Sequence, residues 1–264
     1  KNILHEYSKK SGRGTKKDIW LSFYEYNKWA SISVILHTIK NASGIIFPDP
    51  VIADNIAKVK SCTHIAMTPS IFSLMLSLGL KKSDNVRQVT FGGEYAKQKV
   101  LDLAAKTFPN ARISHVYATS ESGDIMSCSD GLEGYPIDRL ESKQVRIVDD
   151  QLYHRGKPTS DMWEVVNNRI LFSGRSDDIV NVGGTSVNIL QVEDFLIEKF
   201  GLVNAVAKKI KVPILQNSFI VEYVGDLSPS EARDVITKTY SKYHVPIKFI
   251  QVEEIKLSSS GKKV

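Results

Sequence analysis

One short segment places an aromatic ring, hydroxyl groups and a carboxylate at the end of an apolar run. ARISHVYATSESG (residues 111–123) reads as a strand followed by Thr119, Ser120 and Glu121, with Tyr117 just before them. Open α/β folds bind ligands at the carboxyl ends of their strands, where this set could stack on a ring, contact phosphate and hold a metal ion. A strand end capped by small polar residues is the alternative. A serine-hydrolase elbow is excluded, because the glycines that flank its serine are missing.

Three further segments carry weaker signals of the same kind. TFGGEYA (residues 90–96) puts two glycines between a strand and a helix, which allows a flat ligand to approach the backbone, although a tight turn explains them equally well. TSDMWE (residues 159–164) places Asp161 in a turn before a strand, where its carboxylate could accept two ribose hydroxyls or serve as an ordinary turn residue. The tail KLSSSGKKV (residues 256–264) could present Lys262 as a mobile charge or be a frayed terminus.

The sequence does not support two other kinds of site. The tail is not a phosphate-binding P-loop, because the upstream glycine is missing and no helix follows it. The six histidines are scattered along the chain, which disfavours a histidine-based metal site or catalytic triad.

The elements that must position these residues change character along the chain. Strand-like and helix-like runs alternate from residue 18 to residue 119, which indicates βαβ units on a mostly parallel sheet. Residues 125–174, approximately, read as a small antiparallel region, with hairpin turns at Asp149-Asp150 and Asn167-Asn168. An α+β pattern follows. The fold class is therefore α/β, with a mostly parallel sheet and a small antiparallel region, followed by a smaller α+β domain.

The segment SGRSDDIVNVGGTSV (residues 173–187) contains more turn-forming residues than a hairpin needs, which indicates a connection between two domains. We place the boundary at 175–178, giving a larger domain over residues 1–174 and a smaller one over 175–264.

Composition bounds the remaining possibilities. The 264 residues are 42% hydrophobic and 24% charged, as in ordinary globular proteins. No apolar run approaches the ~20 residues of a membrane span, and the isolated Cys62 and Cys128 favour buried thiols in a reducing cytoplasm. Residues 1–17 account for +5 of the net charge of +6, and their charges do not alternate with aromatic rings, so nucleic acid is disfavoured as a partner.

Together these motifs resemble, in order and approximate spacing, those of the adenylate-forming superfamily. GGE, YATSE, TSD, GRSDD…VGG…QVED and the terminal SSSGK follow one another over essentially the whole chain, and the GRSDDIVNVGG…VED block is the most specific. That superfamily contains acyl- and aryl-CoA synthetases, carrier-protein adenylation domains and luciferases. The resemblance implies that residues 1–174 are the C-terminal part of the large domain and that residues 175–264 are the small mobile domain.

The resemblance also implies a role for each site residue. Tyr117 would stack on the adenine of ATP, and Asp161 and Arg175 would bind the ribose hydroxyls. Ser120 would contact phosphate, Glu121 would hold Mg²⁺, and Lys262 would be the catalytic lysine. Asp177 would be the hinge. The other nucleotide- and acceptor-binding positions would be Gly93, Glu94, Tyr95, Ala118, Thr119, Gly183 and Gly184.

The implied reaction joins a small-molecule carboxylic acid to a thiol through an acyl-adenylate. The DDIVNVGG form of the hinge block is more like CoA ligases, so CoA is the expected acceptor and a carrier protein the alternative. The chain departs from the family in Ala118, Ser120 and Ser160, each standing where another residue is usual. The phosphate loop is absent, so we expect a missing N-terminal segment. A non-catalytic protein that binds the nucleotide or a partner therefore stays open.

Overall fold

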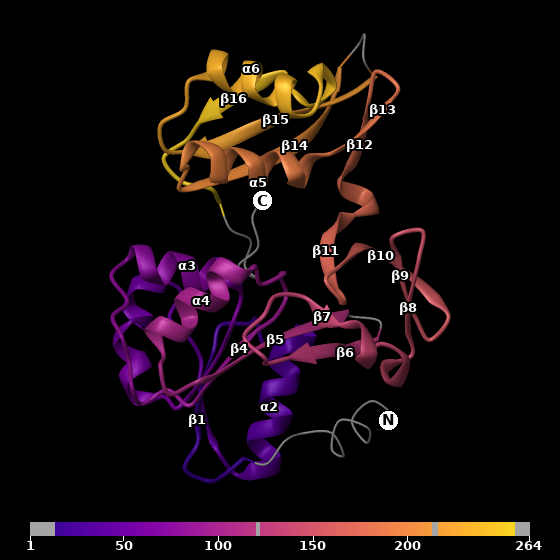
Figure 1. Cartoon of the computed structure of the whole chain (residues 1–264). Coiled ribbons are helices and arrows are strands. Elements are labelled where there is room, and N and C mark those ends of the chain that lie inside the picture. Colours follow the sequence, from indigo (N-terminus) through magenta and orange to yellow (C-terminus); the bar gives the residue numbers. More distant parts are fainter. Residues whose placement is uncertain (1–13, 120–121, 213–215, 257–264) are drawn as a thin grey trace.

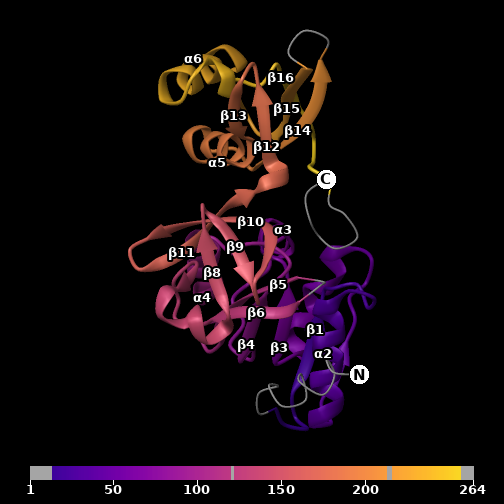
Figure 2. The same ribbon diagram turned by 90° about the vertical axis from the view of Figure 1, so that its right-hand side faces the viewer.

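The computed structural model describes residues 14–119, 122–212 and 216–256 of the chain. Within these ranges it has a six-stranded sheet of order β2-β1-β3-β4-β5-β6 and a five-stranded sheet of order β7-β11-β10-β9-β8. A β12–β13 hairpin and a three-stranded sheet of order β14-β15-β16 follow. In both views the six-stranded and three-stranded sheets lie at opposite ends of the molecule (Figure 1, Figure 2).

The six-stranded sheet is parallel from β1 to β5, and only β6 at its edge runs antiparallel. The expected class of fold, α/β with a mostly parallel sheet, is therefore confirmed. The strands are β1 (Ile19–Ser22), β2 (Gly44–Ile46), β3 (His64–Met67), β4 (Gln88–Phe91), β5 (Arg112–Thr119) and β6 (Gly123–Cys128). Two 3₁₀ turns, Ile52–Asn55 and Ala57–Ser61, lie between β2 and β3.

Helices cover both faces of this sheet (Figure 1). They are α2 (Trp29–Asn41), α3 (Pro69–Ser77) and α4 (Gln98–Thr107). Phe72, Phe91 and Phe108 are fully buried in the core that includes residues of α3 and α4, and such burial stabilises by roughly 1.5–3 kcal/mol per side chain. Helix α3 begins where it does because Thr68 accepts a hydrogen bond from the Ile71 N–H and Pro69 occupies the first turn.

The five-stranded sheet is antiparallel and is built from hairpins. Its strands are β7 (Tyr135–Pro136), β8 (Val145–Val148), β9 (Gln151–His154), β10 (Lys157–Val166) and β11 (Arg169–Arg175). The turns predicted at Asp149-Asp150 and Asn167-Asn168 are confirmed, and all four residues have positive φ, as type I′ turns require. The antiparallel region was expected to begin near residue 125, but β6 pairs with β5 instead, so this sheet begins at β7.

The C-terminal part has a hydrophobic core of its own, which includes the fully buried Val187, Leu196 and Phe219. Its elements are the 3₁₀ turn Ser176–Asp178, β12 (Ile179–Val182), β13 (Thr185–Asn188), α5 (Ile189–Phe200), β14 (Asn204–Val212), β15 (Gln216–Val224), α6 (Pro229–Thr239), the 3₁₀ turn Lys242–His244 and β16 (Lys248–Gln251). Ser228 caps α6 by accepting the Glu231 N–H.

Two findings concern the compositional expectations. Cys62 and Cys128 are both buried and unpaired, as expected of small hydrophobic side chains. In the described part of the chain, every helix is too short or too polar to traverse a lipid bilayer.

Candidate functional site

Three predicted site residues from three strands meet in one hydrogen-bonded group. The Tyr117 hydroxyl on β5 donates to Asp161 Oδ2 on β10 at 2.5 Å. Arg175 Nη1, at the end of β11, donates to Asp161 Oδ1 at 2.8 Å. The carboxylate is buried whereas the guanidinium is about half exposed, so this group opens to solvent on the side of Arg175.

Tyr117 and Arg175 use only part of the hydrogen-bonding capacity of Asp161. Burial, and then the neighbouring Asp161 carboxylate, raise the pKa of Tyr117 well above its usual value, so the phenol stays protonated and donates. Each carboxylate oxygen of Asp161 uses one acceptor position on this chain and retains another.

The secondary structure around Asp161 differs from the one that the sequence predicted. It was expected in a turn before a strand, but it lies within β10, paired with Arg175 of β11. The prediction was wrong because the strand begins earlier, at Lys157. The pairing with β11 shifts register directly after Met162, and such bulges re-aim side chains near functional sites.

A cluster of aromatic rings packs against Tyr117 of this hydrogen-bonded group. Trp163 is almost fully buried, and its ring lies 5.1 Å from that of Tyr117, 6.1 Å from Tyr95 and 5.5 Å from Phe172 between centroids. Tyr95 follows β4 and Tyr117 lies in β5, so the Trp163 ring contacts residues from two neighbouring strands of the six-stranded sheet. Sequence reasoning did not single out Trp163, although its place two residues after Asp161 in a strand was a usable signal.

The loop after β4 lies at the same edge of the sheet. Gly93 is exposed with φ +80°, a conformation that favours glycine. The Glu94 carboxylate accepts the Ser70 N–H at 3.0 Å, at the first turn of α3. In the structure, therefore, this side chain binds the protein's own helix.

The predicted hinge is held by its own short contacts. Arg175 Nη2 lies 3.6 Å from Asp177 Oδ2, and the Arg175 N–H donates to Asp178 Oδ2 at 3.2 Å. Burial raises the pKa of Asp178. Arg175 thus belongs to the hydrogen-bonded group and also contacts the predicted hinge residue.

Gly183 and Gly184 do not join the group at the sheet edge. They form the tip of the β12–β13 hairpin, both with positive φ, and a Cβ on Gly183 would lie 3.0 Å from the Tyr243 ring. Both views show this hairpin running along the C-terminal part, away from β4 and β5 (Figure 1, Figure 2).

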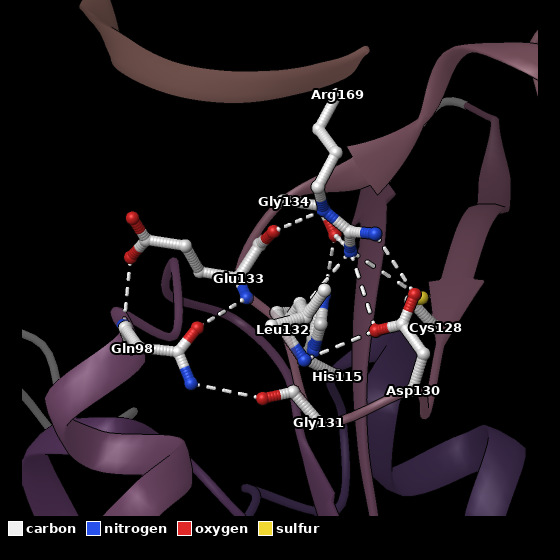
Figure 3. Close-up of polar contacts among 9 residues, drawn as sticks. All are labelled: Gln98, His115, Cys128, Asp130, Gly131, Leu132, Glu133, Gly134 and Arg169. Carbon is white, nitrogen blue, oxygen red and sulfur yellow. Dashed lines mark hydrogen bonds and ion pairs between the residues drawn. The ribbon is translucent and has the colours of Figure 1, made fainter. Parts of the chain in front are cut away.

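A second polar network fixes the strand that carries Arg175 (Figure 3). Arg169, the first residue of β11, donates to the carbonyls of Leu132, Glu133 and Gly134 and to both oxygens of Asp130. Gln98 of α4 exchanges hydrogen bonds with Glu133. The loop at 130–134 is thereby tied to both β11 and α4. Arg169 was not predicted, because its partners are distant in sequence.

Some predicted residues cannot be placed with this group. Ser120, Glu121 and Lys262 lie outside the described residues. Ala118 pairs with Asp124 in the β5–β6 ladder, and Thr119 Oγ1 accepts the Ser122 N–H at 3.1 Å. The residues that the structure describes contain no set of three His, Cys, Asp or Glu side chains suited to a metal ion. These residues do not supply a magnesium site without Glu121.

No protein-family model matches the chain. Among curated proteins it is 23% identical to tyrocidine synthase 3 of Brevibacillus parabrevis, over 81% of this chain and 4% of that protein. It is 24% identical to 3,4-dihydroxybenzoate–[aryl-carrier protein] ligase of Bacillus anthracis, over 55% of this chain and 38% of that protein. The chain therefore spans well under half the length of these relatives.

Solved structures with the same fold cover nearly the whole chain. The amide bond synthetase McbA of Marinactinospora thermotolerans matches with a TM-score of 0.74 and 16% identity, over 99% of this chain and 62% of that one. The o-succinylbenzoate CoA synthetase MenE of Bacillus subtilis, solved with an acyl-adenylate intermediate, matches with a TM-score of 0.70 and 14% identity, over 99% and 62%.

The chain thus shares the fold of these two synthetases. The resemblance to the adenylate-forming superfamily is confirmed, since both the curated relatives and the structural neighbours are adenylate-forming ligases.

Proposed function

We propose that this chain is part of an adenylate-forming ligase that activates a carboxylic acid with ATP and passes the acyl group to a thiol. The observation that carries the proposal is the group formed by Tyr117, Asp161 and Arg175, which the motifs predicted as a nucleotide site and which meets at hydrogen-bond distance. The coverage of 62% of the structural neighbours supports a chain that works together with further polypeptide.

In this proposal the nucleoside end of ATP binds to described residues. The two free acceptor positions of Asp161 take the ribose hydroxyls, and the hydrogen-bonded ion pair with Arg175 holds the carboxylate in place. The ring of Tyr117, backed by Trp163, stacks on adenine. Preorganised partners of this kind bind without rearranging, which lowers the cost of association.

The chemical step would use residues that the structure does not describe. A carboxylate that attacks the α-phosphate brings two anions together, and positioned cations must offset their repulsion. The proposal assigns this charge to Lys262, with Ser120 contacting phosphate and Glu121 as the magnesium ligand. Holding the reactants in line supplies the remaining acceleration.

The proposed acceptor is CoA, with the β12–β13 hairpin tip at Gly183-Gly184 meeting the thiol after rotation about Asp177. The match to a CoA synthetase and the form of the hinge block support it. A carrier protein is the second candidate, because one sequence relative is an aryl-carrier protein ligase by name. Turnover with each acceptor distinguishes the two.

Rotation of residues 175–264 against residues 1–174 is part of the proposal. Lys97, just before α4, forms an ion pair with Asp194 of α5. Both side chains are about half exposed, and exposed pairs contribute little, typically below about 1 kcal/mol. An ion pair of this strength would stabilise the present arrangement of the two parts without preventing their rotation.

Calorimetric titration of ATP and AMP into the chain tests the proposal. In the Asp161→Asn variant the charged acceptor is lost, so we expect affinity to fall by roughly tenfold or more, as for hydrogen bonds to charged groups. Asp226→Asn, on the exposed surface, is the matched control. Acid-dependent pyrophosphate exchange then separates a working enzyme from a protein that only binds the nucleotide. Absence of binding by the wild-type chain would refute the proposal.

A further inference from the structure

The buried Tyr24 hydroxyl connects the ends of two neighbouring strands. It donates to the Met67 carbonyl at the end of β3 at 2.7 Å and lies 3.2 Å from the Gly92 carbonyl just after β4. Burial raises the pKa of Tyr24 far above its usual value, so this hydroxyl remains a donor. Tyr24 itself follows β1, so one side chain from a third strand fixes the spacing of the other two.

Glu94 makes a second connection from the same loop. Its carboxylate accepts the Ser70 N–H at 3.0 Å, at the N-terminus of the nine-residue helix α3. A carboxylate there is stabilised both by the hydrogen bond and by the helix dipole. The loop after β4 is thus tied to α3 on one side and to Tyr24 on the other.

The two glycines of this loop are closely packed against the same elements. A Cβ on Gly92 would lie 3.1 Å from the Tyr24 hydroxyl, and one on Gly93 would lie 3.6 Å from Thr68 Cγ2. Turn geometry alone does not require the contact at Gly92, which has no positive φ. The backbone of residues 92–95 is therefore held by long-range contacts rather than by its own conformational preference.

We infer that Tyr24 and Glu94 are positioning residues for the base of the bound nucleotide. The inference rests on the proposed function and extends it: the edge of adenine would lie along Gly93, Glu94 and Tyr95, which the motifs predicted as binding positions. Neither side chain touches the base in this arrangement. Each acts by fixing the directions of the backbone N–H and carbonyl groups of residues 92–95.

Fixed backbone groups give selectivity for the base. Adenine presents an amino donor at the position where guanine presents an oxo acceptor. A backbone carbonyl or N–H that cannot reorient forms a hydrogen bond with one of these groups and leaves the other without a partner, which is unfavourable. A loosened loop would reorient, so selectivity should fall more than affinity.

The test compares the dissociation constants of AMP and GMP for the full chain by calorimetry. The variants are Tyr24→Phe, which removes only the hydroxyl, and Glu94→Ala, with Glu94→Gln as the conservative replacement that keeps an acceptor. Tyr26→Phe is the matched control, because Tyr26 is 77% exposed. We expect the AMP/GMP selectivity to fall about fivefold in Tyr24→Phe and Glu94→Ala, as for one lost hydrogen bond. Glu94→Gln and Tyr26→Phe should stay near wild type.

The outcomes separate this inference from the proposed function. A purely structural role would lower the melting temperature and weaken AMP and GMP equally, leaving their ratio unchanged, and that result overturns the inference alone. A wild-type ratio near one would also overturn it. If the wild-type chain binds neither nucleotide, the proposed function fails and the inference fails with it. Should Glu94→Ala not fold, the isosteric Tyr24→Phe decides.

Discussion

Replacing Arg169 by methionine should destabilise the chain more than the same replacement at any other arginine of the five-stranded sheet. Its guanidinium makes five hydrogen bonds to oxygen atoms, three to consecutive backbone carbonyls and two to Asp130, and a sixth contact to Cys128 Sγ at 3.7 Å (Figure 3). The side chain is only 15% exposed. Methionine keeps the apolar stem but leaves those acceptors without their donor.

The magnitude follows from these contacts. A net contribution of about 0.5–1.5 kcal/mol per hydrogen bond would give a wide range for five, and contacts that share one group are not additive. Water can reach Asp130, which is about one-third exposed, and will replace part of its loss. We therefore expect roughly 3–4 kcal/mol of lost unfolding free energy, at the upper end of single substitutions.

The acidity of Asp130 provides an internal check on the cause. Burial opposes ionisation, yet the hydrogen bonds from Arg169 hold the pKa of Asp130 at about 2, below its usual 3.8. The stabilisation is therefore present above pH 4 and is lost as pH falls towards 2. The difference between wild type and variant should shrink over the same interval.

Urea unfolding followed by tryptophan fluorescence measures the effect, since Trp163 is buried in the neighbouring aromatic cluster. Arg146→Met in β8 is the control, because that arginine is exposed. A loss below about 1 kcal/mol for Arg169→Met, or a loss that does not depend on pH between 4 and 2, would show that the network is not a structural anchor.

Three further outcomes are expected. Gly134→Ala should prevent folding or cost more than about 4 kcal/mol, because its Cβ would collide with the Ile170 carbonyl at a positive φ; the yield of folded protein and urea unfolding check it. Burial lowers the pKa of His115, so the chain should lose stability as pH falls below about 6.5, measured by thermal unfolding, and His115→Phe should flatten that dependence. Lys97→Glu and Asp194→Lys should each change the distance between labels placed on the two parts of the chain, and the double variant should restore it.

The sequence was most informative where structure is decided locally. The type I′ turns at Asp149-Asp150 and Asn167-Asn168 follow from residues that tolerate positive φ, and the cap at Ser228 follows from its neighbours within one helical turn. Which strand pairs with which other strand is not decided by neighbouring residues in the sequence. Residues 123–128 read as a strand in either sheet, and only the folded chain shows that they pair with β5.

The same limit applies to the candidate site. Tyr117, Asp161 and Arg175 were identifiable because each lies in a motif, but their mutual contacts join residues up to 44 positions apart. Tyr24 and Arg169 lie outside any motif, and their importance comes entirely from long-range carbonyl partners. A residue of this kind cannot be distinguished from an ordinary tyrosine or arginine by composition or periodicity.

Arg175 shows how the site and the hinge depend on each other. One arm of its guanidinium donates to Asp161 at 2.8 Å, while the other lies 3.6 Å from Asp177. A planar fork can serve two carboxylates at once, which the point charge of a lysine cannot do in the same geometry. Movement of Asp177 changes the surroundings of the guanidinium that holds Asp161. If the hinge rotates as proposed, the affinity for the nucleotide must differ between the two positions, and by linkage the nucleotide must favour one of them.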